Sequence, residues 1–131
     1  MRIEDGPFGK VVVKIIPKVI QTLAEGGFDL IVDEVVFGEE GLKRYAQALS
    51  GEMAYFIGVM CDLPTLQERE ILRGDRALGL GRDQIRRVHT LSQFYDLSID
   101  TTTKSAFENA KEILKFIKEN PAPQGFKRIK E

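Results

Sequence analysis

Residues 28–34 read FDLIVDE, a short apolar run that ends in two adjacent carboxylates, Asp33 and Glu34. Strands that are apolar on both faces are typical of parallel sheets that helices cover on both sides. We therefore expect a strand over residues 30–36. Two further apolar runs, over residues 54–60 and 95–99, predict two more strands of the same sheet.

Helical patterns separate these runs. Over residues 11–25 apolar residues recur at helical spacing, and Pro17 predicts that this helix either kinks or begins at that position. Further helices are expected over residues 38–49, 64–73, 83–91 and 105–118, the last with the capping-box spacing of Ser105 and Glu108. The alternation predicts an α/β fold with parallel strands, whose ligands bind beyond the carboxyl ends of the strands.

Composition excludes several classes of protein. A chain of 131 residues with 43% hydrophobic residues fits one ordinary globular domain. Its net charge of −1 gives no bulk attraction to nucleic acid or to an anionic membrane, and its apolar stretches are too short to span a bilayer. Cys61 is the only cysteine, which fits a reducing compartment. We expect a soluble cytoplasmic protein.

Asp33 and Glu34 are the candidate metal ligands. Two carboxylates at the end of a buried strand cost desolvation energy unless a metal, a water molecule or a donor satisfies them. In P-loop enzymes the Walker B strand ends in an aspartate that helps to hold Mg²⁺ beside the nucleotide phosphates. The alternative is that the pair leaves the sheet and turns to solvent.

The phosphate-binding loop G-x-x-x-x-G-K-[ST], known as Walker A, does not occur in these 131 residues. The nearest match is GPFGKV at residues 6–11, which is two residues short and has valine where the metal-binding hydroxyl belongs. We interpret this segment as a turn before a helix.

The candidate phosphate-binding groups are arginines. Six of them lie in or near a segment with glycines at positions 74, 79 and 81: Arg69, Arg73, Arg76, Arg82, Arg86 and Arg87. Guanidinium groups match phosphate oxygens in pairs, and glycines permit a mobile loop, so the segment suggests a lid that closes over phosphates and excludes water. The alternative is a solvated helix face on which Glu68 and Glu70 pair with the arginines.

Other polar side chains leave alternatives open. His89 is the only histidine, and it fits either a general base or phosphate donor or a purely structural group. Cys61, at a predicted strand end, fits either a reactive or a buried, inert thiol. Thr101 and Thr102 fit either contact with a ligand or capping of the final helix, and capping is the expectation.

The chain resembles the chloramphenicol 3-O-phosphotransferase family over nearly its whole length, up to about Ile117. The resemblance is carried by Cys61-Asp62, Glu68-Arg69-Glu70, Arg73-Gly74-Asp75-Arg76, Val88-His89, Tyr95-Asp96 and Asp100-Thr101-Thr102. It implies a three-layer P-loop kinase fold that uses ATP and Mg²⁺ to phosphorylate a small-molecule hydroxyl, as in chloramphenicol. By that resemblance Arg69, Arg73 and Arg76 are lid arginines near the phosphates, and Asp33 is the Walker B carboxylate.

The chain also departs from the family pattern, because the amino-terminal strand, P-loop, helix and second strand have no counterpart. We expect residues 1–119 to be one truncated domain with about three strands, and residues 120–131 to be a frayed polar tail. Without the phosphate cradle and the catalytic base, the chain is expected to be inactive. A late start site, a truncated gene or a split gene would each account for the difference.

The missing strand belongs, by the resemblance, between the strands at residues 30–36 and 54–60. Their open edges favour self-association or poor solubility. One alternative is a non-catalytic interaction protein, or one half of a split kinase, that pairs through those edges with a partner such as a separate amino-terminal half. Another is an enzyme of different chemistry built on Asp33, Glu34 and His89.

Overall fold

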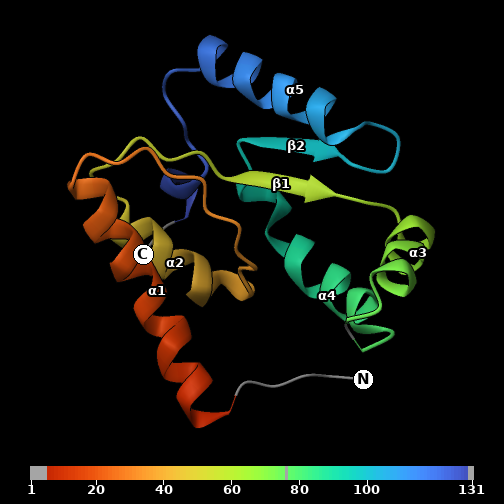
Figure 1. Ribbon diagram of the computed structural model, residues 1–131. Coiled ribbons are helices and arrows are strands. Elements are labelled where there is room, and N and C mark those ends of the chain that lie inside the picture. Colours follow the sequence, from red (N-terminus) through yellow and green to blue (C-terminus); the bar gives the residue numbers. More distant parts are fainter. Residues whose placement is uncertain (1–5, 76, 130–131) are drawn as a thin grey trace.

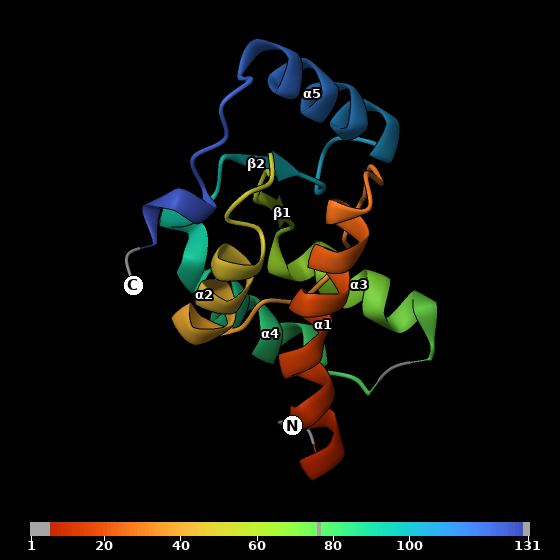
Figure 2. The ribbon, with the colours of Figure 1, turned by 90° about the vertical axis from the view of Figure 1, so that its left-hand side faces the viewer.

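The computed structural model describes residues 6–75 and 77–129. Along the chain its elements are α1 (Pro7–Glu25), α2 (Gly38–Ala48), β1 (Ile57–Met60), α3 (Leu63–Arg73), α4 (Leu80–Val88), the 3-10 helix η1 (His89–Phe94), β2 (Leu97–Asp100), α5 (Ala106–Glu119) and the 3-10 helix η2 (Phe126–Arg128). α5 lies on one side of the strand pair, and α2 and α4 lie on the other (Figure 1). The view turned by 90° shows the same order, with the amino-terminal half of α1 projecting from the rest (Figure 2).

β1 and β2 form a parallel pair, the only sheet within the described residues. Ile57 lies opposite Leu97 and Met60 opposite Asp100, and just beyond the pair the Thr101 N–H donates to the Met60 carbonyl at 2.8 Å. Parallel strands need a long connection, which α3, α4 and η1 provide. The predicted strands over residues 54–60 and 95–99 are therefore confirmed, although both are shorter than expected.

The strand expected over residues 30–36 is wrong. Residues 28–37 form neither helix nor strand, and Ile31 is fully exposed at 102%. An apolar run becomes a strand only where a neighbour offers a ladder of hydrogen bonds, and the described residues place no strand beside this segment. The mixed α/β class is confirmed, but the sheet has two strands in the described residues instead of about three.

The helices follow the predicted pattern closely. α1 begins at Pro7 and continues through Pro17, so the helix does not begin at Pro17 and residues 7–11 are helical, not a turn. Proline has no backbone N–H, and it is well placed in a first turn because an N–H at that position would have no partner within the helix. The helix expected over residues 83–91 starts earlier, at Leu80, and changes to 3-10 geometry at His89. No helix of the described residues is long and apolar enough to cross a bilayer.

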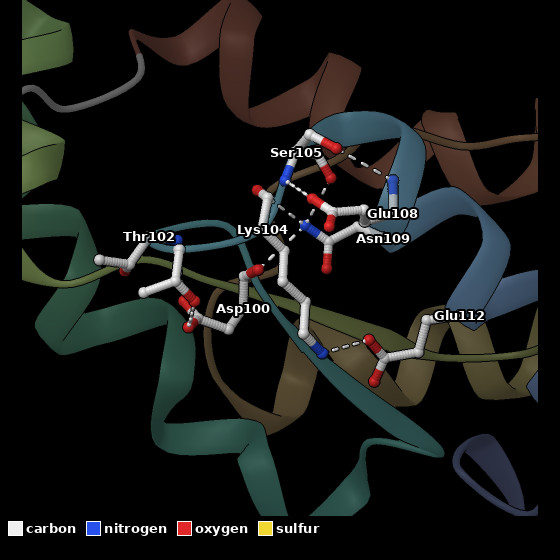
Figure 3. Close-up of polar contacts among 8 residues, drawn as sticks. Asp100, Thr102, Lys104, Ser105, Glu108, Asn109 and Glu112 are labelled. Atoms are coloured by element: carbon white, nitrogen blue, oxygen red, sulfur yellow. Dashed lines mark hydrogen bonds and ion pairs between the residues drawn. The ribbon is translucent and has the colours of Figure 1, made fainter.

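A capping box begins α5, as the sequence predicted. Ser105 Oγ accepts from the Glu108 N–H at 3.2 Å, and the Glu108 carboxylate accepts from the Ser105 N–H at 2.7 Å (Figure 3). The buried Asn109 amide donates to the Asp100 carbonyl at 2.9 Å and thereby fastens α5 to the end of β2. The Thr102 N–H donates to the Asp100 carboxylate at 2.8 Å, which lowers the pKa of that carboxyl.

The segment after α5 is not frayed where the structure describes it. The Asp96 carboxylate accepts from the backbone N–H groups of Gln124 and Gly125 at 2.7 and 2.8 Å, and from Phe56 at 2.9 Å. The Phe126 ring stacks on Phe56 with their centroids 5.1 Å apart. Asp96 therefore joins the start of β1 to the carboxyl-terminal segment, so the expectation of a frayed tail is wrong over these residues.

The apolar core is small for a chain of this length. The described hydrophobic residues that are buried are Leu42, Tyr45, Leu91, Tyr95 and Ile99. The accessible surface is 9312 Å², whereas a compact monomer of this mass exposes about 7,000 Å². The difference indicates that much apolar surface lacks a covering layer.

Candidate active site

One cavity brings together most of the residues that the sequence singled out. Its volume is about 360 Å³, and it lies between residues 33–36, β1, α3 and α4. Its polar lining includes Asp33, Glu34, Cys61, Arg69, Arg73 and His89. A second cavity of about 300 Å³ lies between α2 and the segment around Phe126, away from these groups. The first cavity is therefore the candidate active site.

Asp33 and Glu34 reach this cavity from an extended segment instead of a strand end. Both are exposed, so the desolvation argument that rested on a buried strand does not apply. The Glu34 carboxylate accepts from the Val35 N–H at 3.2 Å. Burial and, secondarily, the nearby Glu34 charge raise the pKa of Tyr45 to about 12. Within the described residues no three His, Cys, Asp or Glu side chains gather into a metal-binding group.

Arg69 is fixed against the end of the sheet. Its guanidinium donates to the Thr101 carbonyl at 2.5 Å and to the Thr101 hydroxyl at 3.1 Å. The same group lies 3.5 Å from Cys61 Sγ. Because Thr101 follows β2 and Cys61 follows β1, Arg69 ties α3 to the carboxyl ends of both strands.

We expected Thr101 and Thr102 to cap the final helix, but they do not. The Thr101 hydroxyl donates to the Met60 carbonyl at 2.9 Å, and the Thr102 hydroxyl accepts from the Asp62 N–H at 2.8 Å. Ser105 is the cap instead. The two threonines join the ends of β1 and β2. Thr101 also accepts the hydrogen bonds from Arg69.

Arg73 is less constrained. It forms an ion pair with Asp75 at 2.8 Å, and both side chains are more than half exposed. Solvent screens a pair of this kind, which contributes little to stability, so Arg73 is available for another anion. Arg76, the third predicted lid arginine, lies outside the described residues.

His89 also lines the cavity. Its Nδ1 lies 3.0 Å from the Tyr95 hydroxyl, and burial lowers the pKa of the imidazole. Burial also raises the pKa of Tyr95. Sequence patterns gave no role to Tyr95 or to Asp96. Asp96 binds residues far away in the chain, and the contact of Tyr95 with His89, six residues earlier, follows no recognised motif.

We expect His89 to titrate below its usual pKa of about 6.5. Because the pKa is lowered in the folded chain, the stability present above the unfolded pKa is lost as pH falls from that value through the lower pKa of the folded chain. The chain has one histidine, so its ring C–H resonance can be followed alone by NMR between pH 4 and 8. Tyr95→Phe is the control, and should leave the shift in place because burial causes it. A midpoint at or above the unfolded value would contradict this assignment.

The strand pair and its helices are consistent with a P-loop-like kinase fold. Residues 3–118 match the family described as chloramphenicol phosphotransferase-like protein, and the chain belongs to that family.

Two curated relatives from Mycobacterium tuberculosis are similar to the chain. They are named "Putative O-phosphotransferase MT2714" (strain CDC 1551 / Oshkosh) and "Putative O-phosphotransferase Rv2636" (strain ATCC 25618 / H37Rv), and each is 28% identical over 113 residues. The match covers 86% of this chain and 50% of each relative, so the chain spans about half the length of the curated relatives it matches. No solved structure gives a significant match.

Proposed function

We propose that this chain is the carboxyl-terminal portion of a phosphotransferase that transfers the γ-phosphoryl group of ATP to a small-molecule hydroxyl of the chloramphenicol type. The observation that carries the proposal is one cavity whose lining includes both Asp33 and Glu34 and the arginines Arg69 and Arg73. Membership of the family and the names of the two relatives support it. A cytoplasmic location fits the lone cysteine and the use of ATP.

In this proposal Arg69 and Arg73 bind phosphate oxygens, and Asp33 with Glu34 holds Mg²⁺. Magnesium commonly takes one or two carboxylates and completes its shell with water and substrate phosphates. Two adjacent exposed carboxylates fit that donor set without a third protein ligand. Bound Mg²⁺ would neutralise charge on the phosphates, and the arginines would hold their oxygens. Arg73 would exchange Asp75 for phosphate.

Phosphoryl transfer also needs a backbone cradle for the phosphates, its lysine and a base for the acceptor proton. The acceptor oxygen forms a bond to the γ-phosphorus while the bond to the β-bridging oxygen breaks and ADP leaves. The motif that supplies the cradle does not occur in these 131 residues. We therefore propose that the cradle and the base come from a polypeptide outside them, and that the chain alone is inactive.

The first test is an assay of the chain alone. Mixed with ATP, Mg²⁺ and chloramphenicol or other hydroxyl compounds, it should give no phosphorylated product and no ADP above background, as measured by chromatography. Turnover that disappears in Asp33→Ala would overturn the claim of inactivity. Asp29→Ala is the matched control, since it removes a carboxylate from the same exposed segment outside the cavity lining.

A second candidate function is a non-catalytic interaction protein, or one half of a split kinase. The observation that favours it is an open strand edge: β1 pairs with β2 alone in the described residues, and residues 33–36 of the extended segment line the same cavity as β1. Translation of the DNA upstream of Met1 in all frames discriminates the readings. A G-x-x-x-x-G-K-[ST] motif within about 60 codons favours the kinase. If the motif is in frame, the start site was placed too late; if it is out of frame, the gene is broken or split. Absence of the motif favours the interaction protein.

A further inference from the structure

The carboxylate of Glu70 joins α3 to the beginning of α4. Its two oxygens accept from the backbone N–H groups of Gly79 and Gly81, at 2.7 and 2.8 Å. These groups lie at the first turn of α4, where N–H groups have no partner within the helix. A charged acceptor that binds both is stronger than a neutral one, and the helix dipole favours it there.

The backbone around this contact is built for close approach. Gly79 has φ +90°, a conformation that glycine adopts readily, and it precedes the first residue of α4. A Cβ at Gly81 would lie 3.1 Å from the Leu66 side chain of α3, so the two helices leave little room there. Glu70 and Leu66 thus fix the start of α4 from one face of α3.

The two helices that Glu70 connects both contribute to the cavity wall. α3 supplies Arg69 and Arg73, and α4 supplies Gln84 and leads into His89. Arg69 is tied to the sheet through Thr101, so α3 is the fixed element of the pair. The position of the α4 wall relative to the arginines therefore depends on the Glu70 contact.

We propose that Glu70 is a positioning residue that sets α4, and with it His89, against the arginine wall of the cavity. Its importance for phosphate binding rests on the proposed function, whereas its effect on α4 does not.

The test compares Glu70→Gln with Glu68→Gln in the full 131-residue chain, by NMR-detected amide hydrogen exchange. The two substitutions remove the same charge from the same helix, and Glu68 is exposed. Exchange at Gly79 and Gly81 should rise about tenfold in Glu70→Gln, because glutamine offers one acceptor where the carboxylate offers two charged ones. The His89 ring resonances should shift as well. Glu70→Asp, one methylene shorter, should keep the charge and give an intermediate increase.

The amide of Thr101, which donates to Met60 across the sheet, reports on the rest of the fold. It should exchange at the same rate in all variants. Equal exchange at Gly79 and Gly81 in Glu70→Gln and Glu68→Gln would overturn the proposal. So would a rise at Thr101 as large as that at the glycines, because Glu70 would then support overall stability only. If Glu70→Gln does not fold, Glu70→Asp decides by the same comparison. A confirmed local effect, together with no turnover when the chain is combined with the polypeptide encoded upstream, would remove the proposed function and leave the positioning role.

Discussion

Produced alone at micromolar concentration, the 131-residue chain is expected to self-associate instead of remaining a monomer. It exposes 9312 Å², about 2,300 Å² more than a compact monomer of this mass. The excess is larger than the surface that each partner buries in a standard protein interface, about 800 Å². Large exposed apolar side chains gather on α1 and on residues 28–37, and a net charge of −1 provides little repulsion between copies. Size-exclusion chromatography with light scattering measures the outcome.

A matched pair of substitutions locates the surface responsible. Ile31→Lys places a charge at a fully exposed position of the extended segment, and should shift the distribution toward monomer. Ile71→Lys places the same charge on the exposed face of α3, where Ile71 is 65% exposed, and should change the distribution less. A monodisperse monomer with a cooperative thermal transition would contradict the expectation.

The second large effect is expected from Gly58→Ala. A Cβ at residue 58 would lie 2.2 Å from two atoms of the Tyr95 ring, far inside van der Waals contact. The ring cannot move aside easily, because it packs edge-on against Phe56 with centroids 4.8 Å apart and its hydroxyl meets His89. Relief of the overlap must separate β1 from Tyr95, the residue that follows η1, at a cost of about 3 kcal/mol.

NMR amide spectra measure this effect even if the chain does not melt cooperatively. Gly58→Ala should lose the dispersed resonances of β1 and β2, while Gly51→Ala should keep them. Gly51 is the control because a Cβ there meets nothing within 4 Å and its φ is not positive. Equal spectra for the two variants would show that the sheet does not depend on this contact.

Local signals predicted the helices and the two paired strands, whereas contacts between distant residues escaped the sequence. The capping box at Ser105 and Glu108 is a spacing of three residues, and the structure contains it. The strand over residues 30–36 failed because apolar composition does not supply a hydrogen-bonding neighbour. The carboxyl-terminal segment packs through Asp96, whose partners lie as far as 40 residues away in the chain.

The candidate site shows the same division. The sequence indicated carboxylates, arginines and a histidine, and one cavity contains Asp33, Arg73 and His89. It did not indicate that Thr101 binds Arg69, because no motif announces a contact between the residue after β2 and the middle of α3. Residue types that prefer anions or metals can be found by pattern, but the groups that orient them depend on the fold.

The most direct test of the proposed half-site is reconstitution of phosphoryl transfer. The chain is combined with the polypeptide encoded upstream, fused in frame or added as a separate chain, and ADP and phosphorylated acceptor are measured with ATP and Mg²⁺. We predict turnover in the combination, none in either part alone, and at least about a hundredfold loss in Asp33→Ala and Arg73→Ala, with Asp29→Ala close to the unsubstituted protein. Turnover that is unchanged by Asp33→Ala and Arg73→Ala would contradict the assignment of this cavity to the phosphotransferase site.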